Sequence, residues 1–460
     1  MPEVEWEYPT PADFQWEWLR DPHKYVAVEG ATWTGKTTVF EPYLFQEAHA
    51  PVKRGDEFWW MCPTVEQAKA VYDNVKRQLE DAGVIGSGYG CSDNLREITT
   101  PEGGILCYKT AEKPDFVFGI RNVRMIVVDE FTRCRISLWP ALKSISDKTG
   151  AKIRFIGNYK GDDSVWHLWI KTMLKSPNFR YYKTPAQASI DAGFMPQSAF
   201  DEARDTLPEV VFKALYMCEG TDDPSLLVSY GAVSDLWTND HVPDGDPALT
   251  CDIALHGSDR FVMHRWKGLV LHEITVLEKK EPQEVTAIIQ GKATEHSIPR
   301  SRIAYDADGL GAYLRGYLQG ATPYQGGKVS LPIAGQKLSY QNIRSQCHFA
   351  AADAMNDRKI WIKTNAYKEQ MEQEIFACLR TNGQNAALQW GIFPKDAAEV
   401  GAKARLGRSP DIFDPIPMRM FLELSAKPMF IDGLRETVRR KSVSFKPTQK
   451  HEGNTKFTGR

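Results

Sequence analysis

The sequence predicts an α/β protein with two successive units, the first built on a doubly wound, mainly parallel sheet and the second on a mixed sheet. From about residue 24 to 185, short and nearly continuous apolar runs alternate with helical patterns. Such runs are typical of parallel strands that are covered on both faces. From residue 249, three strand-like runs follow one another with short turns, which indicates an antiparallel meander.

Composition fits two or three domains, because the chain has 460 residues, 42% hydrophobic and 25% charged. No apolar run approaches the length of about 18 residues that a membrane span needs. The N-terminal stretch MPEVEWEYPT is acidic, unlike a secretory signal, so we expect no membrane segment. Eight cysteines are scattered without a C-x-x-C pair, which favours reduced thiols of a cytosolic protein over a zinc site.

The C-terminal segment is basic. Between Arg435 and Arg460 stand eight Lys or Arg residues and two Glu, so this segment carries +6 and the rest of the chain −8. Because it lacks apolar periodicity, we predict a disordered tail over residues 431–460. Such an arm could dock on an acidic protein, follow DNA phosphates, or be dispensable.

The first unit is predicted to contain βαβ repeats, since the helical pattern VEQAKAVYDNVKRQLEDAG separates two of its strands. Its strands are expected at residues 24–30, 57–64, 104–110, 124–130, 152–158 and 179–185.

The stretch VEGATWTGKTTVF, residues 28–40, fits the phosphate-binding pattern G-x-x-x-x-G-K-[ST] between a strand and a helix. Backbone N–H groups around Gly30 and Gly35 would wrap the phosphates of ATP, and Lys36 would reach the β and γ oxygens. The Thr37 hydroxyl would ligate Mg²⁺, and Thr38 would join the nucleotide contacts.

Two further strand ends complete the predicted ATP site. RMIVVDEF ends in Asp129, which can hold Mg²⁺, and in Glu130, which can activate the attacking water. RFIGNYKG ends in Asn158, which could sense the γ-phosphate and move a neighbouring domain, or could simply form a turn before Gly161.

Together these motifs resemble the ATPase domain of the large terminase subunit of tailed bacteriophages. In that family the order is a phosphate loop, a strand ending in PT with a Q-A pair, a strand ending in DE, and a strand ending in Asn. The matching positions here are Pro63, Thr64, Gln67, Ala68, Asp129, Glu130 and Asn158.

The phosphate loop departs from the family pattern, because Trp33 and Thr34 stand where many members carry an Arg. The charge-stabilising Arg must then come from elsewhere, such as a neighbouring subunit. Arg121 and Arg124 are candidates, although either could be a solvated surface side chain. The aromatic N-terminal segment is expected to pack on this unit, and its Gln15 could reach adenine or be exposed.

The second unit has the element order of a ribonuclease-H-like fold, in which the first and fourth strands lie side by side. Three antiparallel strands precede βα units and a long helix. Strands are expected at 249–257, 259–268, 269–280, 302–306 and 328–333, and helices at 282–296, 311–320 and 340–357.

Acidic residues of this unit are predicted to meet. Asp252 lies in the first strand, Asp306 ends the fourth before a Gly-rich turn, and SPDIFDPIP supplies Asp411 and Asp414 on one helix face. Clustered carboxylates are ligands for two Mg²⁺ or Mn²⁺ ions, which stabilise the attacking and leaving oxygens in phosphodiester cleavage. Each acid alone could instead be a strand end, a turn residue or a helix cap.

The resemblance extends to these positions, since the terminase nuclease has acids at equivalent places. It implies a catalytic triad of Asp252, Asp306 and Asp414, with Asp308 and Asp411 as further metal ligands. It also implies that YQNIRSQ supports the site through Asn342 and Arg344. A departure is DPIP, where the family has D-A-L, so Pro415 and Pro417 could distort the start of that helix.

The resemblance implies residues 1–219 as an ATPase domain, 220–230 as a linker and 231–430 as a nuclease. It implies a motor that hydrolyses ATP with Mg²⁺, translocates double-stranded DNA into a prohead and cuts concatemers. Expected partners are DNA, the portal protein, the small terminase subunit and copies of the chain in a ring, with a monomer in solution possible. The expected location is the host cytoplasm and, transiently, the prohead. Alternatives are an ATP-driven helicase or remodeller, or an assembly protein with a non-catalytic second domain.

Overall fold

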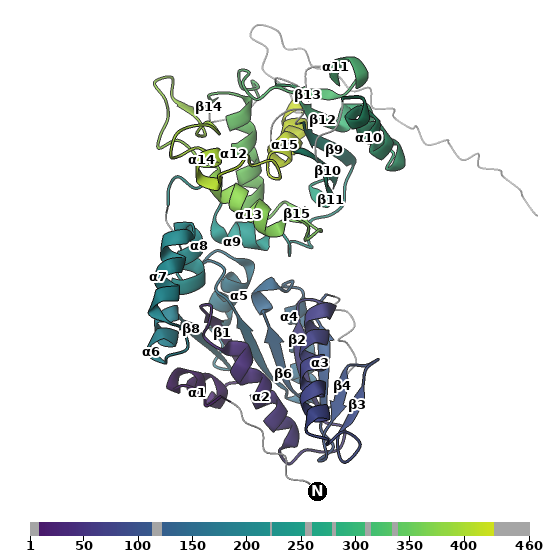
Figure 1. Cartoon of the computed structure of the whole chain (residues 1–460), viewed down its shortest axis with the longest axis vertical. Coiled ribbons are helices and arrows are strands. Elements are labelled where there is room, and N and C mark those ends of the chain that lie inside the picture. The colour runs from purple at the N-terminus through teal and green to yellow at the C-terminus, as the bar shows by residue number, and fades with distance from the viewer. Residues whose placement is uncertain are drawn as a thin grey trace, which may run out of the picture.

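A computed structural model describes residues 9–112, 122–220, 223–253, 260–277, 282–308, 314–333 and 339–426. Two parts are stacked along the long axis of the molecule (Figure 1). We call residues 9–220 the N-terminal part and residues 223–426 the C-terminal part. The basic tail and Arg121 lie outside the described residues. Among the helices that the structure describes, none combines the length and the hydropathy needed to cross a bilayer.

The N-terminal part contains an eight-stranded sheet in the order β3-β4-β5-β2-β6-β7-β1-β8. All six predicted strands are confirmed, and they pair in parallel. The hairpin β3-β4, which pairs antiparallel with β5, was not predicted, because three-residue strands are too short to show alternation. The strands are β1 (Tyr25–Gly30), β2 (Glu57–Cys62), β3 (Gly90–Ser92), β4 (Glu97–Thr99), β5 (Ile105–Thr110), β6 (Val123–Asp129), β7 (Lys152–Gly157) and β8 (Phe179–Thr184).

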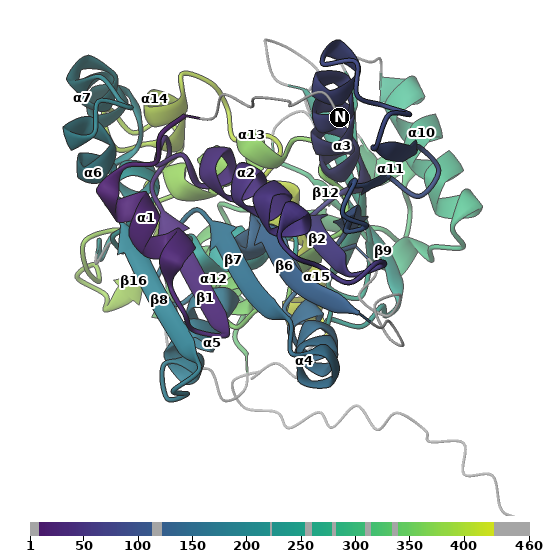
Figure 2. The same cartoon turned by 90° about the horizontal axis from the view of Figure 1, so that it is seen from below.

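Helices cover both faces of this sheet, as a doubly wound fold requires (Figure 2). One core packs α1, α2 and α3 against the sheet, and the other packs α4 and α5 against the opposite face. A 3₁₀ turn (Phe131–Arg133) follows β6 and a π-helical turn (Lys213–Met217) follows α8. The helices are α1 (Asp13–Arg20), α2 (Lys36–His49), α3 (Val65–Asp81), α4 (Leu138–Thr149), α5 (Val165–Met173), α6 (Ala186–Asp191), α7 (Gln197–Thr206) and α8 (Glu209–Phe212).

The PT and Q-A motif of the sequence has a structural role at the start of α3. The Thr64 hydroxyl accepts a hydrogen bond from the Gln67 N–H, and the Gln67 side chain accepts one from the Thr64 N–H, both at 3.3 Å. This reciprocal capping box satisfies two backbone donors that would otherwise lack partners. Ala68 lies on the buried face of α3, in the core against the sheet.

The C-terminal part contains a six-stranded mixed sheet in the order β13-β12-β9-β10-β11-β15. The first three strands form the expected antiparallel meander, and β12 pairs in parallel with β9. The predicted adjacency of the first and fourth strands, and with it the ribonuclease-H-like arrangement, is therefore confirmed. The strands are β9 (Pro247–Asp252), β10 (Phe261–Lys267), β11 (Val270–Leu277), β12 (Ile303–Asp306), β13 (Thr322–Tyr324) and β15 (Trp361–Ile362).

The strand predicted at 328–333 is wrong, because the fifth strand is β13 at Thr322–Tyr324. Around Leu331 the backbone bonds to the side chain of Gln346 and not to a neighbouring strand. Gln346 accepts a hydrogen bond from the Leu331 N–H at 2.7 Å and donates one to the Leu331 carbonyl at 3.0 Å. The apolar side chains of this segment still pack into a core, which explains the apolar pattern without a strand.

Helices α9, α12, α13 and α15 pack with the sheet in the principal core of the C-terminal part. A 3₁₀ turn (Arg300–Arg302) precedes β12, and β14 (Ser339–Tyr340) pairs with β16 (Gln389–Trp390) in a small separate sheet. The helices are α9 (Tyr230–Asp235), α10 (Pro282–Glu295), α11 (Leu314–Tyr317), α12 (Ile343–Asn356), α13 (Lys368–Ala377), α14 (Ala402–Leu406) and α15 (Pro415–Ser425).

A polar cluster joins the two parts. Arg358 of the C-terminal part donates to the carboxylates of Asp163 and Asp235, each at 3.1 Å. Asp235 also accepts the Val165 N–H at 3.0 Å, and Ser229 donates to Asp163. Burial raises the pKa of Asp235 to about 6, with the Arg358 charge opposing that rise. The exact domain boundaries, 1–219, 220–230 and 231–430, remain predictions.

We predict that Arg358→Ala destabilises the protein by about 2 kcal/mol at pH 8, because it leaves the buried Asp235 carboxylate without its cation. At pH 5, below the pKa of Asp235, that group is largely neutral, so the loss should be smaller. Thermal unfolding midpoints at both pH values test this. Lys359→Ala is the matched control, since Lys359 is exposed and pairs only with Asp357 among described residues. Equal losses at the two pH values would contradict the assignment.

Candidate active sites

The predicted phosphate-binding loop connects β1 to α2 and is organised around Lys36. The Lys36 ammonium donates to the carbonyls of Gly30 (3.0 Å) and Ala31 (2.9 Å), to Thr34 Oγ1 (3.0 Å) and to Asn158 Oδ1 (3.0 Å). Burial lowers its pKa to about 8. In a nucleotide complex, phosphate oxygens would take the place of these four oxygens as partners of Lys36. The ammonium already lies inside the loop where the phosphates would bind.

Two glycines are required by the loop geometry. Gly35 caps α2 in the left-handed region with φ 68°, where a side chain is strained. A Cβ on Gly30 would lie 2.7 Å from Thr34 Oγ1, so a larger residue there would displace the loop. Trp33 of the same loop has a positive φ and is exposed.

Gln15 corrects one expectation, because it is buried rather than exposed. Its side-chain amide donates to the Thr34 carbonyl at 2.9 Å, and its carbonyl accepts the Ala12 N–H at 2.9 Å. The N-terminal helix α1 is thereby attached to the phosphate loop. A polar residue amid aromatic ones in DFQWEWLR was the available signal for such a contact.

The predicted magnesium ligands of the ATP site lie together. Thr37 Oγ1 is 3.2 Å from Asp129 Oδ2, although Thr37 comes from the start of α2 and Asp129 from the end of β6. Burial, reinforced by the nearby Glu130 charge, raises the pKa of Asp129 to about 6. A hydroxyl and a carboxylate are hard oxygen donors that suit Mg²⁺. Thr38, the next residue, is exposed.

The strand order explains how Asn158 reaches this site. Strand β7 lies between β1 and β6, so its carboxyl end places Asn158 between the phosphate loop and Asp129. Sequence separation hides this juxtaposition, since Asn158 and Lys36 are 122 residues apart.

Glu130, the predicted water-activating residue, is paired with Arg133. Glu130 Oε2 accepts from Arg133 Nη1 at 2.6 Å, and the Glu130 N–H donates to Asp129 Oδ1 at 2.9 Å. Its backbone has φ 47°, a left-handed conformation that costs a glutamate on the order of 1 kcal/mol and is typical of functional sites. The other Arg candidate, Arg124, pairs with Asp56 at the amino end of β6, away from the phosphate loop.

The second candidate site is a cavity of about 460 Å³ in the C-terminal part. Four of its lining residues are the predicted acids Asp252, Asp306, Asp308 and Asp414. Asp252 and Asp306 end the neighbouring strands β9 and β12, and Asp414 immediately precedes α15, which packs on both strands. Asp308 is oriented by Gly326, whose N–H donates to its carboxylate at 2.8 Å.

Asp411 does not line this cavity, although its charge acts on Asp252, and its expected helical pairing with Asp414 is wrong. Both residues belong to the turn before α15, and Pro415 occupies the first position of that helix. Proline is well tolerated there, so Pro415 starts the helix rather than distorting it. The Asp411 carboxylate instead accepts the Arg260 N–H at 3.4 Å.

Electrostatics in the cavity depend on Lys395, which the sequence analysis missed. Lys395 forms an ion pair with Asp414. Burial, with the Asp414 carboxylate nearby, raises the pKa of Asp252 well above its usual range, and burial raises that of Asp306 to about 6. Burial disfavours the Lys395 charge, but Asp414 and Asp252 outweigh it and raise the lysine pKa. The residue stands in the segment GIFPKDAAE, which has no motif that marks it.

Helix α12 brings the two predicted supporting residues to the same cavity. Asn342 caps the helix by accepting the Ser345 N–H at 2.8 Å, and Arg344 lines the cavity. His348, one turn further along, also lines it and shares a hydrogen bond with the Arg344 carbonyl at 2.8 Å. Its burial lowers its pKa to about 3, so the imidazole is neutral.

A side chain of α13 holds the turn that contains Asp414 in place. Glu374 is fully buried, accepts the Phe413 N–H at 2.8 Å and pairs with Arg408. A buried carboxylate that holds the residue before Asp414 restricts where the Asp414 side chain can point. Sequence patterns give no sign of this contact, because Glu374 lies in an ordinary helical stretch.

The donor set of the cavity fits Mg²⁺ or Mn²⁺, because carboxylate oxygens are the hard ligands that both ions prefer. In the part of the chain that the structure describes, no three His, Cys, Asp or Glu side chains are drawn together tightly enough to form a preformed metal cage. The positive charge among the carboxylates is that of Lys395. Asp252, Asp306 and Asp414 would hold the ions, with Asp308 beside them.

No protein-family model matches the chain, and no curated protein is a significant match. Solved structures do match. The chain is similar to large terminase subunits of bacteriophages.

The large terminase of a thermophilic bacteriophage aligns over 90% of this chain and 99% of its own, with 13% identity and a TM-score of 0.41. The nuclease domain of the large terminase subunit gp2 of bacterial virus Sf6 aligns over 42% and 98%, with 18% identity and a TM-score of 0.37. The ATPase domain of the Thermus phage P74-26 large terminase aligns over 45% and 98%, with 17% identity and a TM-score of 0.36. The first of these proteins has been solved with ADP and the Sf6 domain with manganese.

We predict that Lys395→Met makes the stability of the protein more dependent on divalent ions. Without the ammonium, the carboxylates of Asp252, Asp306 and Asp414 repel one another, and a bound cation relieves that repulsion. The rise in unfolding midpoint on adding Mg²⁺ or Mn²⁺ should be about twofold larger than in the parent protein. Lys403→Met, which removes an exposed pair with Asp396, is the control. The same rise in all three proteins would contradict this prediction.

Proposed function

We propose that the chain is the motor and nuclease of a viral DNA-packaging machine. It hydrolyses ATP to move double-stranded DNA into a prohead and cuts concatemeric DNA with a metal-dependent nuclease. The observation that carries the proposal is the joining, in one chain, of a phosphate loop with Asp129 and Glu130 beside it to a ribonuclease-H-like sheet whose carboxylates line a cavity.

ATP hydrolysis would use groups of the N-terminal part alone. Lys36 neutralises the β and γ oxygens, and Thr37 with Asp129 holds Mg²⁺, which offsets charge on the phosphates. Glu130 orients and deprotonates the attacking water. Asn158 bonds to Lys36 in this structure and, from β7, can follow any movement of the ammonium when phosphate is bound or lost.

DNA cleavage would use the cavity of the C-terminal part. Bound metal ions supply charge for the attacking and leaving oxygens of the phosphodiester. Asp252, Asp306 and Asp414 would hold the ions, and Asp308 lines the same cavity. Arg344 and Lys395 also line it and would offset phosphate charge. Lys395 pairs with Asp414 in this structure, and it would be available to a phosphate oxygen if a metal ion took that carboxylate.

The cavity distinguishes this proposal from its rivals. A helicase or remodeller, or an assembly protein with a docking domain, has no need of four acids around one cavity. Gathering them costs free energy that Lys395 offsets only in part, since the pKa of Asp252 is still raised, and this favours a site that takes up metal cations.

The remaining parts of the proposal concern partners and place. We propose a ring of copies around DNA, in contact with the portal protein and the small terminase subunit, with residues 431–460 as the basic arm that docks. The protein would act in the host cytoplasm and on the prohead during packaging.

We predict that Lys36→Ala and Glu130→Ala both abolish ATP hydrolysis, by different routes. Lys36→Ala removes a phosphate contact and weakens ATP binding. Glu130→Ala lowers kcat by about 10²–10⁴-fold while ATP still binds. Steady-state hydrolysis and binding of a fluorescent ATP analogue measure the two effects. Glu112→Ala, an exposed neighbour, is the control. Parental hydrolysis by the Glu130 variant would exclude its catalytic role.

We predict that Asp306→Asn abolishes DNA cleavage and leaves ATP hydrolysis intact, because the acids serve only the metal ions of the C-terminal part. Plasmid nicking in Mg²⁺ or Mn²⁺ measures the loss, expected to exceed about 10²-fold. Ca²⁺ should bind without supporting cleavage, since it accepts looser geometry. Asp396→Asn, on an exposed carboxylate, is the control. Normal cutting by the Asp306 variant would reject the nuclease site.

A further inference from the structure

A large cavity of about 1060 Å³ lies between the N-terminal and C-terminal parts. Its floor is formed by the segments that follow β2, β5, β6 and β7, at the carboxyl edge of the eight-stranded sheet. Its opposite wall is formed by α9, β15, α13 and the segment between β15 and α13. Arg133, the partner of Glu130, lines the floor, so the cavity adjoins the predicted ATP site.

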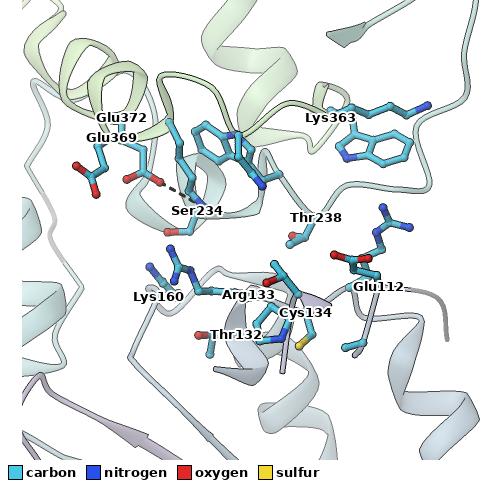
Figure 3. A pocket seen from close by; sticks show the side chains of 18 of the residues that line it. Glu112, Thr132, Arg133, Cys134, Lys160, Ser234, Thr238, Lys363, Glu369 and Glu372 are labelled. Atoms are coloured by element: carbon cyan, nitrogen blue, oxygen red, sulfur yellow. Dashed lines mark ion pairs between the residues drawn. The ribbon is translucent and has the colours of Figure 1, made fainter. Parts of the chain in front are cut away.

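Arg133 has carboxylates on two sides. In this structure it donates to Glu130 at 2.6 Å. On the far wall, α13 carries Glu369 and Glu372, and Figure 3 shows both across the cavity from Arg133 and Lys160. Burial disfavours the Arg133 charge, but Glu130, Glu372 and Glu369 together raise its pKa. The acids of both parts therefore act on one guanidinium.

Pairing with Arg133 restrains Glu130. The Glu130 oxygen that accepts from the guanidinium is not free to orient a water molecule while the pair is formed. The backbone of Glu130 lies in the left-handed region, and such a conformation persists only where the surroundings impose it. Release of Arg133 would free the carboxylate.

Other cations make the pairing on α13 sensitive to position. Lys368 lies 4.0 Å from Glu372, and burial lowers the Lys368 pKa to about 8. Burial also lowers the pKa of Lys160, and the Glu372 carboxylate opposes this. Lys368 moves with the two carboxylates because it belongs to α13, whereas Arg133 and Lys160 lie on the floor. A small shift of α13 against the floor would therefore change the distances from Glu369 and Glu372 to Arg133 and Lys160.

We propose that Arg133 is a positioning residue through which the C-terminal part controls ATP hydrolysis. With Arg133 on Glu130 hydrolysis is held back; with Arg133 drawn to Glu369 and Glu372, Glu130 is free to act on water. The proposal rests on the proposed role of Glu130. It adds that Glu369 and Glu372 of the C-terminal part regulate the ATP site of the N-terminal part.

The test is steady-state ATP hydrolysis by the full-length protein at low salt. Arg133→Ala should raise kcat by about fivefold with KM unchanged, because Glu130 is no longer restrained. The double variant Glu369→Gln/Glu372→Gln should lower kcat by about fivefold, because Arg133 then stays on Glu130. Adding Arg133→Ala to that double variant should restore the raised kcat, since the acids act only through Arg133.

Arg133→Lys keeps the charge and should return kcat close to the parental value. Arg77→Ala, at an exposed arginine of α3 that bonds to Asn74, is the control and should leave kcat unchanged. A loss of hydrolysis in Arg133→Ala, which would mean a direct role in the reaction, overturns the proposal. So does an effect of the two Gln substitutions that persists without Arg133.

Failure of the proposed function gives a different result. Glu130→Gln, alone and with Arg133→Ala, should be inactive in both cases. If both variants hydrolyse ATP, the assignment of Glu130 is wrong. If both variants are inactive but Arg133→Ala alone does not raise kcat, the catalytic role of Glu130 is supported and the proposed control through Arg133 and α13 is wrong.

Discussion

Both candidate sites depend on parallel pairing between neighbouring strands. Parallel strands deliver their carboxyl ends to one edge of a sheet, and polar side chains at those ends are then brought together from distant parts of the chain. In the N-terminal part, β6 and β7 place Asp129 and Asn158 beside the loop that follows β1. In the C-terminal part, β9 and β12 do the same for Asp252 and Asp306.

Gathering charge at these edges requires compensation, and each site uses a lysine for it. Lys36 lies among backbone and side-chain oxygens of the phosphate loop, and Lys395 lies among the carboxylates of the second cavity. A buried charge without a partner is costly. Both lysines therefore stabilise a polar arrangement in the protein alone, and both can exchange their present oxygen partners for those of a bound anion.

Most of the fold followed from local pattern. Continuous apolar runs predicted the central strands, and motifs at the strand ends predicted that Lys36, Asp129 and Asn158 lie near one another, as they do. The predictions that were wrong depended on single side chains from distant parts of the sequence. Gln346 replaces the ladder around Leu331, so an apolar pattern there does not make a strand. Likewise, Lys395, Gln15 and Arg133 act through contacts that no periodicity encodes, and the exact turn before α15 decides that Asp414 rather than Asp411 faces the cavity.

The two parts follow one another in the sequence, and Arg358 of the second bridges Asp163 of the first to Asp235. A short covalent connection keeps the partner groups at an effective concentration on the order of millimolar. At such a concentration even a contact with modest intrinsic affinity is closed most of the time. The same contact can open without the parts separating, and it re-forms at the speed of an intramolecular collision rather than that of a diffusional encounter.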